Sequence, residues 1–288
     1  MQHYPEAALY IVATPIGNLA DISLRALQVL QLVDAIACED KRHTQPLLRQ
    51  YGIDKPLLAL HQHNEAEAAG GVVQRLQRGE RVAYVSDAGT PAVSDPGARL
   101  VAAVRAAGFK VIPLPGASSV TTVLSAAGVT RAEGSEGSGS SFVFAGFLPS
   151  KAGERDQAIA LLQADSRPVV ILEAPHRIEA LARAMAVLGG RLVTVGRELT
   201  KQFEEIATMP AQDFAAWLAA GPQRTRGEFA LVLHASSAQK GPDDSLRVLQ
   251  LLLAELPLKT AVKLAADITG APRNQLYDTA LKLRKEAD

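Results

Sequence analysis

Glycine, proline and acidic side chains gather in loops that directly follow short apolar runs of this sequence. In "RVAYVSDAGTPAVSDPGARLVAAVRAAG", Val82–Val85 has the length of a buried strand, and an alanine-rich helical pattern begins after Pro96. Between them, Asp87 can accept hydrogen bonds from a cationic or hydroxylated ligand, and Gly89 lets a ligand approach the backbone closely. Asp95 is expected to cap the helix and Pro96 to be its first residue. The alternative for the loop is an ordinary tight turn built from good turn residues.

Loops of similar composition follow other strand-like runs. Open α/β sheets bind their ligands at the carboxyl ends of parallel strands, so such loops are candidates for a shared site. Any one of them alone is equally typical of a turn, a cap or an ion pair, but their number favours the site. They are "TPIGN" (14–18), "CEDKRHT" (38–44), "PLPGASS" (113–119), "GFLPSK" (146–151), "LEAPHRI" (172–178) and "GRELTKQFEE" (196–205).

Two α/β domains are expected to position these loops. In the first half, strands and helices alternate, which predicts a parallel sheet with helices on both faces. In the second half, strand candidates follow one another with fewer helices between them, which favours an antiparallel or mixed sheet. The expected strands are 9–13, 35–38, 56–60, 82–85 and 110–113, then 142–147, 168–172, 192–195, 203–209 and 228–234. The expected helices include 23–32, 64–78, 154–164, 176–188 and 211–219.

The domain boundaries are expected where the composition shifts. Residues 1–130 would form the N-terminal α/β domain and residues 142–235 the second one, joined by a flexible Gly/Ser loop or linker at 131–141. Residues 236–288 would be a linker and a helix-turn-helix-like tail. In that tail Gly270 stops one helix and Pro272 starts the next.

The amino-acid composition excludes several classes of protein. Of 288 residues 48% are hydrophobic and 21% are charged, which is typical of a globular chain, and 30 basic and 30 acidic side chains cancel. Nucleic-acid binding would therefore depend on local patches. Cys38 is the only cysteine, which excludes internal disulfides and fits a reducing compartment. Because no signal peptide and no membrane-spanning apolar run is visible, the cytoplasm is the expected location, with no membrane partner.

Several common catalytic motifs are missing. There is no Gly-Lys pair for a phosphate-binding loop, a single glycine after the first strand where a dinucleotide fingerprint needs three, and neither G-x-S-x-G nor H-E-x-x-H. His61 and His63 alternate at a strand end without nearby carboxylates, which is more typical of surface histidines than of metal ligands. No metal site is expected.

Seven segments, in chain order, resemble the ribosomal RNA small subunit methyltransferase I family, a branch of the tetrapyrrole-methylase superfamily. The resemblance covers nearly the whole chain. Lys41, where threonine is usual, and the longer Gly/Ser segment at 133–141 depart from the family pattern. The segments are "LYIVATPIGNLADISLRAL", "EDKRHT", "YVSDAGTPAVSDPG", "PLPGASS", "FVFAGFLPSK", "ILEAPHRI" and "VGRELTKQFEE".

The resemblance implies an S-adenosylmethionine-dependent enzyme that methylates the ribose 2′-oxygen of a cytidine in the decoding centre of 16S rRNA. It also implies a chain of two α/β domains with the cofactor in the cleft between them, a similar C-terminal helical tail, and assembly as a homodimer. With the sheet types expected above, the fold class is two α/β domains of the tetrapyrrole-methylase type, an N-terminal parallel sheet and a C-terminal mixed sheet, with a small helical tail. The residues implied to bind the cofactor are Pro15, Gly17, Asp87, Ala88, Gly89, Ser118, Ser119, Leu172, Gly227, Glu228 and Phe229.

The acceptor side of the site, where the ribose hydroxyl would bind, needs a group that activates this weak nucleophile. Glu198 and Lys201 are the favoured candidates, because "GRELTKQFEE" combines opposite charges after a strand, and a structural ion-pair network explains them almost as well. His176 has the most suitable ordinary pKa, but it is equally typical of a helix start.

Three alternatives stay open. The tail from 245 to 288 carries seven basic and five acidic residues, so it either contacts RNA or caps the core. The same fold could methylate a tetrapyrrole or a protein side chain. The chain could also be a non-catalytic ribosome-assembly or RNA-binding module. Because the implied target lies deep in rRNA structure, the assembled 30S subunit is the expected substrate.

Overall fold

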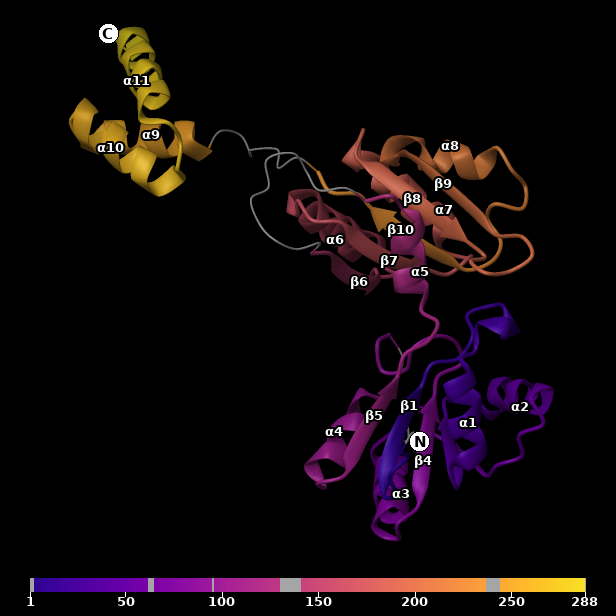
Figure 1. Cartoon of the computed structure of the whole chain (residues 1–288). Coiled ribbons are helices and arrows are strands. Elements are labelled where there is room, and N and C mark those ends of the chain that lie inside the picture. The colour runs from indigo at the N-terminus through magenta and orange to yellow at the C-terminus, as the bar shows by residue number, and fades with distance from the viewer. Residues whose placement is uncertain (1–2, 62–64, 95, 130–140, 237–243, 288) are drawn as a thin grey trace. The chain divides into compact units, whose positions relative to one another are not determined.

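The computed structural model describes residues 3–61, 65–94, 96–129, 141–236 and 244–287. The chain divides into two compact units, one of residues 1–163 and 167–235 and one of residues 164–166 and 236–288. The larger unit contains two five-stranded sheets and the smaller one contains three helices (Figure 1). Asp95 and nearly all of the Gly/Ser segment at 131–141 lie outside the described residues.

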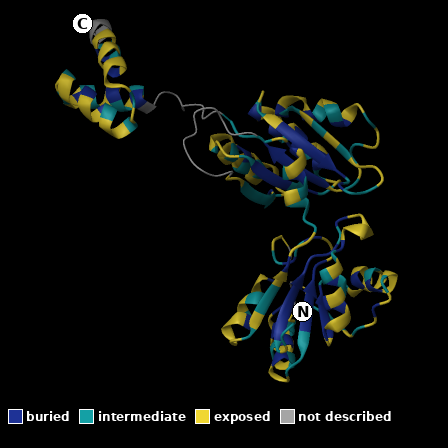
Figure 2. Cartoon of the chain, in the orientation of Figure 1, coloured by how far each residue is buried: buried dark blue, intermediate teal, exposed yellow. Residues whose placement is uncertain are grey.

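The first sheet has five strands in the order β3-β2-β4-β1-β5, all of them parallel. This confirms the parallel sheet expected from the alternation of strands and helices. Strand β1, an inner strand of the sheet, is buried at all of its residues, which is why its sequence is a continuous apolar run (Figure 2). The strands are β1 (Ala8–Val12), β2 (Ala35–Cys38), β3 (Leu57–Ala59), β4 (Arg81–Val85) and β5 (Lys110–Leu114).

Helices cover both faces of this sheet. Tyr10 packs with α1 residues such as Val29 on one face, and Leu9 packs with α3 and α4 residues such as Leu76 on the other. Successive residues of a strand point to opposite faces of the sheet, so Tyr10 and Leu9 belong to two different apolar clusters. The helical segments are η1 (Leu19–Asp21), α1 (Leu24–Leu32), α2 (Lys41–Gln50), α3 (Glu65–Gln77), α4 (Ala98–Ala106) and α5 (Ser119–Ala126).

The expected start of helix α4 was wrong. The helix begins at Ala98 with Gly97 as its N-cap, so Pro96 is not its first residue. The physical reason is a cap supplied from another helix: Glu65 of α3 accepts hydrogen bonds from the backbone N–H groups of Gly97 (3.0 Å) and Arg99 (3.2 Å). Gly97 has φ +132° and packs against the Tyr84 ring, which leaves no room for a side chain.

The second sheet is mixed, in the order β6-β7-β10-β8-β9, as expected from the closely spaced strand candidates. Only β6 and β7 pair in parallel, and the other neighbours are antiparallel. Its strands are β6 (Val143–Phe147), β7 (Val169–Glu173), β8 (Leu192–Arg197), β9 (Glu205–Pro210) and β10 (Phe229–Leu233). Its helical segments are α6 (Ala152–Ala164), α7 (Ile178–Met185), η2 (Ala186–Leu188), η3 (Ala211–Asp213) and α8 (Phe214–Ala219).

An apolar cluster joins loops of the first sheet to the second sheet. Ile16, from the loop after β1, belongs to the same cluster as Leu199, from the loop after β8. Helix α5 contributes Val123, which packs with Val170 and Ala230 of the second sheet. The chain segment before residue 130 therefore supplies a helix to the face of the second sheet.

The small unit consists of α9 (Asp244–Glu255), α10 (Leu258–Thr269) and α11 (Arg273–Ala287). The expectation of two helices was incomplete, because α9 precedes them and supplies Leu249 to their common core. Gly270 ends α10 in the left-handed conformation (φ +69°), and α11 starts directly after Pro272, as the sequence predicted. Among the described residues, no helix is long and apolar enough to cross a membrane.

Candidate active site

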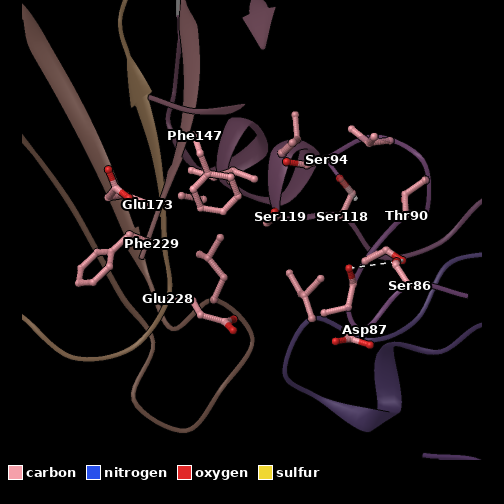
Figure 3. Close-up of a pocket in the computed structure, with 18 of the residues that line it drawn as sticks. Ser86, Asp87, Thr90, Ser94, Ser118, Ser119, Phe147, Glu173, Glu228 and Phe229 are labelled. Atoms are coloured by element: carbon pink, nitrogen blue, oxygen red, sulfur yellow. Dashed lines mark hydrogen bonds between the residues drawn. The ribbon is translucent and has the colours of Figure 1, made fainter. Parts of the chain in front are cut away.

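A cavity of about 400 Å³ lies where loops of the two sheets meet in the large unit. Loops after β4 and β5 line one part of it, and residues at the end of β7 and the start of β10 line another (Figure 3). The β7 and β10 residues meet because antiparallel pairing places Glu173 opposite Phe229. The predicted cofactor residues that line this cavity are Asp87, Ala88, Gly89, Ser118, Ser119, Leu172, Glu228 and Phe229.

The charge of this cavity has one sign. Four carboxylates line it, from Glu39, Asp87, Glu173 and Glu228, and no basic side chain occurs among the described residues of its lining. Such a lining favours a cationic ligand over a phosphate, because like charges in a partly enclosed site repel. The rest of the lining is largely apolar and hydroxyl-bearing, which suits a small organic molecule.

Glu173 is the most deeply placed of these carboxylates. Its side chain is 1% exposed; Oε1 lies 3.0 Å from Nε of Arg177 and accepts a hydrogen bond from the N–H of Ala174 (2.9 Å). The other oxygen, Oε2, is buried without a hydrogen-bond partner among the described residues. A buried acceptor of this kind needs a donor, so the cavity fits a ligand that carries an ammonium, amide or hydroxyl group.

The loop after β4 is held against the loop after β1. Thr14 and Gly89 exchange two backbone hydrogen bonds (2.9 and 3.0 Å), and the Thr14 hydroxyl donates to the carbonyl of Ser86 (3.2 Å). Gly89 has φ +81°, and a Cβ there would lie 3.4 Å from Ile16. Glycine thus permits the turn that brings the Ser86–Gly89 backbone to the cavity.

A second cavity, of about 390 Å³, borders the first. Ser86 and Asp87 line both cavities, so these two residues form a shared wall. The predicted cofactor residues Pro15 and Gly17 line the second cavity and not the first. The remaining lining residues are Leu19, His43, Thr44, Pro46, Leu47 and Gln50.

His43 and Asp87 form a pair at this wall. His43 Nδ1 lies 2.8 Å from Oδ2 of Asp87, and Oδ1 of Asp87 accepts a hydrogen bond from the N–H of Asp40 (3.1 Å). The hydrogen bond with Asp87 raises the pKa of His43. Arg42 holds the pKa of Asp40 at about 2. The sequence prediction missed His43, although it lies in "EDKRHT", one of the loops singled out for its composition.

Glu198, Lys201 and Glu228 form an ion-pair triad beside the first cavity. Lys201 Nζ lies 2.8 Å from Oε1 of Glu198 and 3.1 Å from Oε2 of Glu228, and the N–H of Glu228 donates to Glu198 (2.9 Å). Burial raises the pKa of Glu198. The hydrogen bonds from Lys201 and Glu228 together lower it by more than burial raises it, so the pKa lies below its ordinary value. Burial lowers the pKa of Lys201, and its two carboxylate partners more than offset this.

The same triad fixes the backbone at the cavity. Glu198 (φ +52°) and Thr200 (φ +67°) occupy the left-handed region, which is costly for residues other than glycine. Gly227 has φ +90°, and a Cβ there would lie 2.5 Å from Cδ of Glu198. Gly227 itself lines neither cavity. Because it has no side chain, Glu198 can lie against it and accept the hydrogen bond from Glu228 that holds the Glu228–Phe229 segment in position.

The remaining catalytic candidate, His176, is exposed and lines neither cavity. Glu198 and Lys201 are likewise outside both linings. Within the described ranges, no three His, Cys, Asp or Glu side chains are grouped so that they could hold a metal ion. Most of the predicted cofactor residues thus line the first cavity, whereas Glu198 and Lys201 contact each other beside it and His176 lies apart from both linings.

Solved structures share this architecture. A diphthine synthase superposes with a TM-score of 0.59 at 15% identity, covering 79% of this chain and 90% of that one. Uroporphyrin-III C-methyl transferase from Thermus thermophilus, complexed with S-adenyl homocysteine, gives a TM-score of 0.51 at 15% identity, covering 78% and 96%. The fold is that of the tetrapyrrole methylases, whose sequence model, Tetrapyrrole (Corrin/Porphyrin) Methylases, matches residues 8–215.

Closer relatives define the branch. Ribosomal RNA small subunit methyltransferase I of Escherichia coli O157:H7 is 46% identical over 281 residues, or 96% of each chain. The protein of the same name from Pseudomonas aeruginosa is 46% identical over 280 residues, or 95% of this chain and 96% of that one. The RsmI C-terminal HTH domain model matches residues 239–284. The chain belongs to the ribosomal RNA small subunit methyltransferase I family.

Proposed function

We propose that this protein transfers a methyl group from S-adenosylmethionine to the ribose 2′-oxygen of a cytidine in the decoding centre of 16S rRNA. The names of the close relatives support small-subunit rRNA as the substrate. The structural observation that carries the proposal is the first cavity, whose described lining holds four carboxylates and no basic side chain. A site of that charge suits a cofactor with a sulfonium and an ammonium group better than it suits the RNA backbone.

The residues of the first cavity fit this cofactor. Glu173, a residue of the lining, has a buried Oε2 without a hydrogen-bond partner among the described residues, which would suit a donor group of the cofactor. Gly89 lets the backbone beside Asp87 approach the cofactor closely. Ser118 and Ser119 supply hydroxyl groups at the same cavity. When bound, the cofactor supplies an electrophilic methyl group on a positively charged sulfur. Contacts of Pro15, Gly17 and Gly227 with it stay predictions.

The chain itself contributes alignment and exclusion of water. Methyl transfer to oxygen is an in-line displacement, so the acceptor must be held at one angle to the methyl group in a dry site. Phe144, Phe147 and Phe229 supply apolar surface to the cavity. The triad of Glu198, Lys201 and Glu228 would support the acceptor side by fixing the backbone at Phe229.

The role of the triad can be separated from cofactor binding. Glu198→Gln and Lys201→Met, each alone, should reduce turnover far more than cofactor affinity. His176→Asn tests the third predicted residue in the same assay. Normal turnover in both triad variants would remove Glu198 and Lys201 from the acceptor side.

The macromolecular setting is part of the same proposal. We propose the assembled 30S subunit as the substrate, a homodimer as the active form and the cytoplasm as the location. The tail helices α9 to α11 would contact rRNA. Deleting residues 245–288 should abolish rRNA methylation and spare cofactor binding. If cofactor binding or folding were lost as well, the tail would instead be a structural cap.

The deciding experiment uses purified protein, S-adenosylmethionine with a labelled methyl group, and 30S subunits from cells that lack the endogenous activity. Label should appear in 16S rRNA and survive alkaline hydrolysis as a dinucleotide, because a 2′-O-methyl group blocks cleavage at that position. Label in the base, or none in the RNA, would contradict the proposal. With cofactor bound but no RNA labelled, a tetrapyrrole or protein side-chain acceptor would be tested next, and a chain that binds no cofactor would be a non-catalytic RNA-binding module.

A further inference from the structure

The second cavity has the position expected of an acceptor site. It shares the Ser86–Asp87 wall with the first cavity, so a group bound in it lies next to whatever the first cavity holds. Its volume of about 390 Å³ lies within the usual range of small-molecule sites. Apolar residues such as Leu19 and Leu47 line it together with polar ones such as Gln50. A nucleoside, with one flat apolar part and one hydroxylated part, suits such a lining.

The charge beside the second cavity differs from that of the first. Helix α2, which supplies five of its lining residues, has the sequence KRHTQPLLRQ, with three cationic residues and no acidic one. Lys41 and Arg49 are exposed on this helix. Arg42 pairs with Asp40, the N-cap of this helix, so the positive charge that suits the phosphates flanking a nucleotide within an RNA chain comes from Lys41 and Arg49.

Among the described residues that line the second cavity, the imidazole of His43 has a hydrogen-bond partner that suits proton transfer. A carboxylate only accepts hydrogen bonds, so the 2.8 Å contact requires that Nδ1 of His43 carry the proton and donate it to Asp87. In the neutral ring Nε2 then has the free lone pair. Asp87 is itself fixed by the N–H of Asp40 (3.1 Å), so the ring is held at the wall between the cavities.

We propose that the second cavity binds the acceptor nucleotide and that His43, oriented by Asp87, is the general base that removes the proton of the ribose 2′-hydroxyl. This inference rests on the proposed function. As the oxygen forms its bond to the methyl carbon, the carbon–sulfur bond breaks and its electron pair stays on sulfur. The hydroxyl proton passes to Nε2 of His43, which later returns it to water. No other reactant is required.

The surroundings of His43 set the pH range of this step. Asp87, from the loop after β4, raises the pKa of His43 most; Asp40, the cap of α2, raises it further, and Arg42 on α2 lowers it. The net direction is upward from 6.5. A base must be neutral to act, so the rate of methyl transfer should rise with pH through a value above 6.5 and then level off.

The test measures single-turnover methylation of 30S subunits from pH 6 to 9, at saturating cofactor and saturating subunits, for wild type, His43→Asn and His3→Asn. Asparagine keeps an N–H donor where Nδ1 was but offers no base in place of Nε2. His3 is an exposed histidine and provides the matched control. Cofactor affinity is measured by calorimetry in all three, which shows whether the first cavity is intact.

His43→Asn should lower the rate at pH 8 by about 100-fold to 10 000-fold and remove the rising limb, with cofactor affinity within about twofold of wild type. His3→Asn should behave as wild type. An unchanged pH profile in His43→Asn, or a defect that disappears at saturating subunits, would overturn the inference, and the second result would make His43 an RNA contact. If wild type itself labelled no RNA at any pH, the proposed function would fail instead.

Discussion

Lys201 occupies the space that a side chain at position 17 would need. A Cβ on Gly17 would overlap Cγ of Lys201 and lie 3.0 Å from both Cε of Lys201 and Oγ1 of Thr200. The next residue, Asn18, donates its N–H to the same Thr200 hydroxyl (3.2 Å). The loop after β1 and the loop after β8 therefore interlock, and the second of these loops carries two members of the triad, Glu198 and Lys201.

Gly17→Ala should lower the free energy of unfolding by about 1–3 kcal/mol, the usual cost of overpacking. The lysine stem can move aside, but the movement breaks its 2.8 Å contact with Glu198. Urea unfolding measures the loss. In a Lys201→Ala background the same substitution should cost less, because the obstructing Cγ is gone. Gly70→Ala, in helix α3 with no neighbour within 4 Å, is the control and should be neutral or stabilising. An equal loss in both backgrounds would contradict the interlock.

Alanine substitutions at two glycines with positive φ distinguish the cost of backbone strain from the cost of a steric clash. Gly227→Ala places a methyl group 2.5 Å from Cδ of Glu198, whereas Gly52→Ala meets nothing within 4 Å, at φ +90° and +65° respectively. Gly52→Ala should cost about 1–2 kcal/mol from the backbone alone. Gly227→Ala should cost more, because the added methyl group also displaces Glu198. Urea unfolding of both variants gives the two losses, and equal losses would show that Glu198 moves aside at no cost.

Strong local patterns made most of the fold predictable. The continuous apolar runs of the first sheet and the alternation with helices fixed its strands to within a few residues, because strands buried on both faces have little sequence freedom. Helix α2 was missed because Pro46 stands inside it and its sequence is largely polar. The start of α4 was misplaced because its cap, Glu65, comes from a separate helix.

The site was predictable only in part, for a related reason. Loop composition and the family resemblance identified residues of the first cavity such as Asp87 and Ser118. Pairings between distant segments carry no local signal, so neither the contact of His43 with Asp87 nor that of Lys201 with Gly17 could be inferred. Glu198 and Lys201 were chosen for their charge, and the structure shows that these charges satisfy each other beside the cavity.

The triad should make stability sensitive to acid. The pKa of Glu198 is lower in the folded chain than its ordinary 4.5, so its contribution is fully present above pH 4.5 and is lost as pH falls through the folded value. The amide side chain in Glu198→Gln does not titrate in this pH range. The difference in unfolding free energy between wild type and Glu198→Gln should therefore shrink below pH 4.5, as measured by urea unfolding at several pH values. A constant difference would mean that the carboxylate gains nothing from Lys201.

Glu173→Gln should weaken S-adenosylmethionine binding by about 10-fold to 100-fold, the usual worth of a hydrogen bond to a charged group. Glutamine keeps the size of the side chain but removes the charge and one acceptor. Calorimetry gives the affinity, and a thermal melt shows whether the loss of the Arg177 ion pair has disturbed the fold. Glu179→Gln, exposed on the adjacent helix α7, is the matched control. Wild-type affinity in a folded Glu173→Gln protein would exclude Glu173 from the cofactor site.

Asp87→Asn should lower the pKa of His43 toward its ordinary value of 6.5, because the carboxylate is the main cause of the upward shift. The imidazole signals of His43, assigned with His43→Asn and followed by NMR from pH 5 to 9, give both values directly. The linkage has a definite sign: a raised pKa adds stability that is complete below pH 6.5 and is lost as pH rises through the folded value. Wild type should therefore exceed Asp87→Asn in stability more at pH 6 than at pH 9. A base with a lower pKa is neutral at lower pH. The rise of the methylation rate should therefore occur at a lower pH in Asp87→Asn, and a rise at the wild-type pH would show that His43 is not the group that controls it.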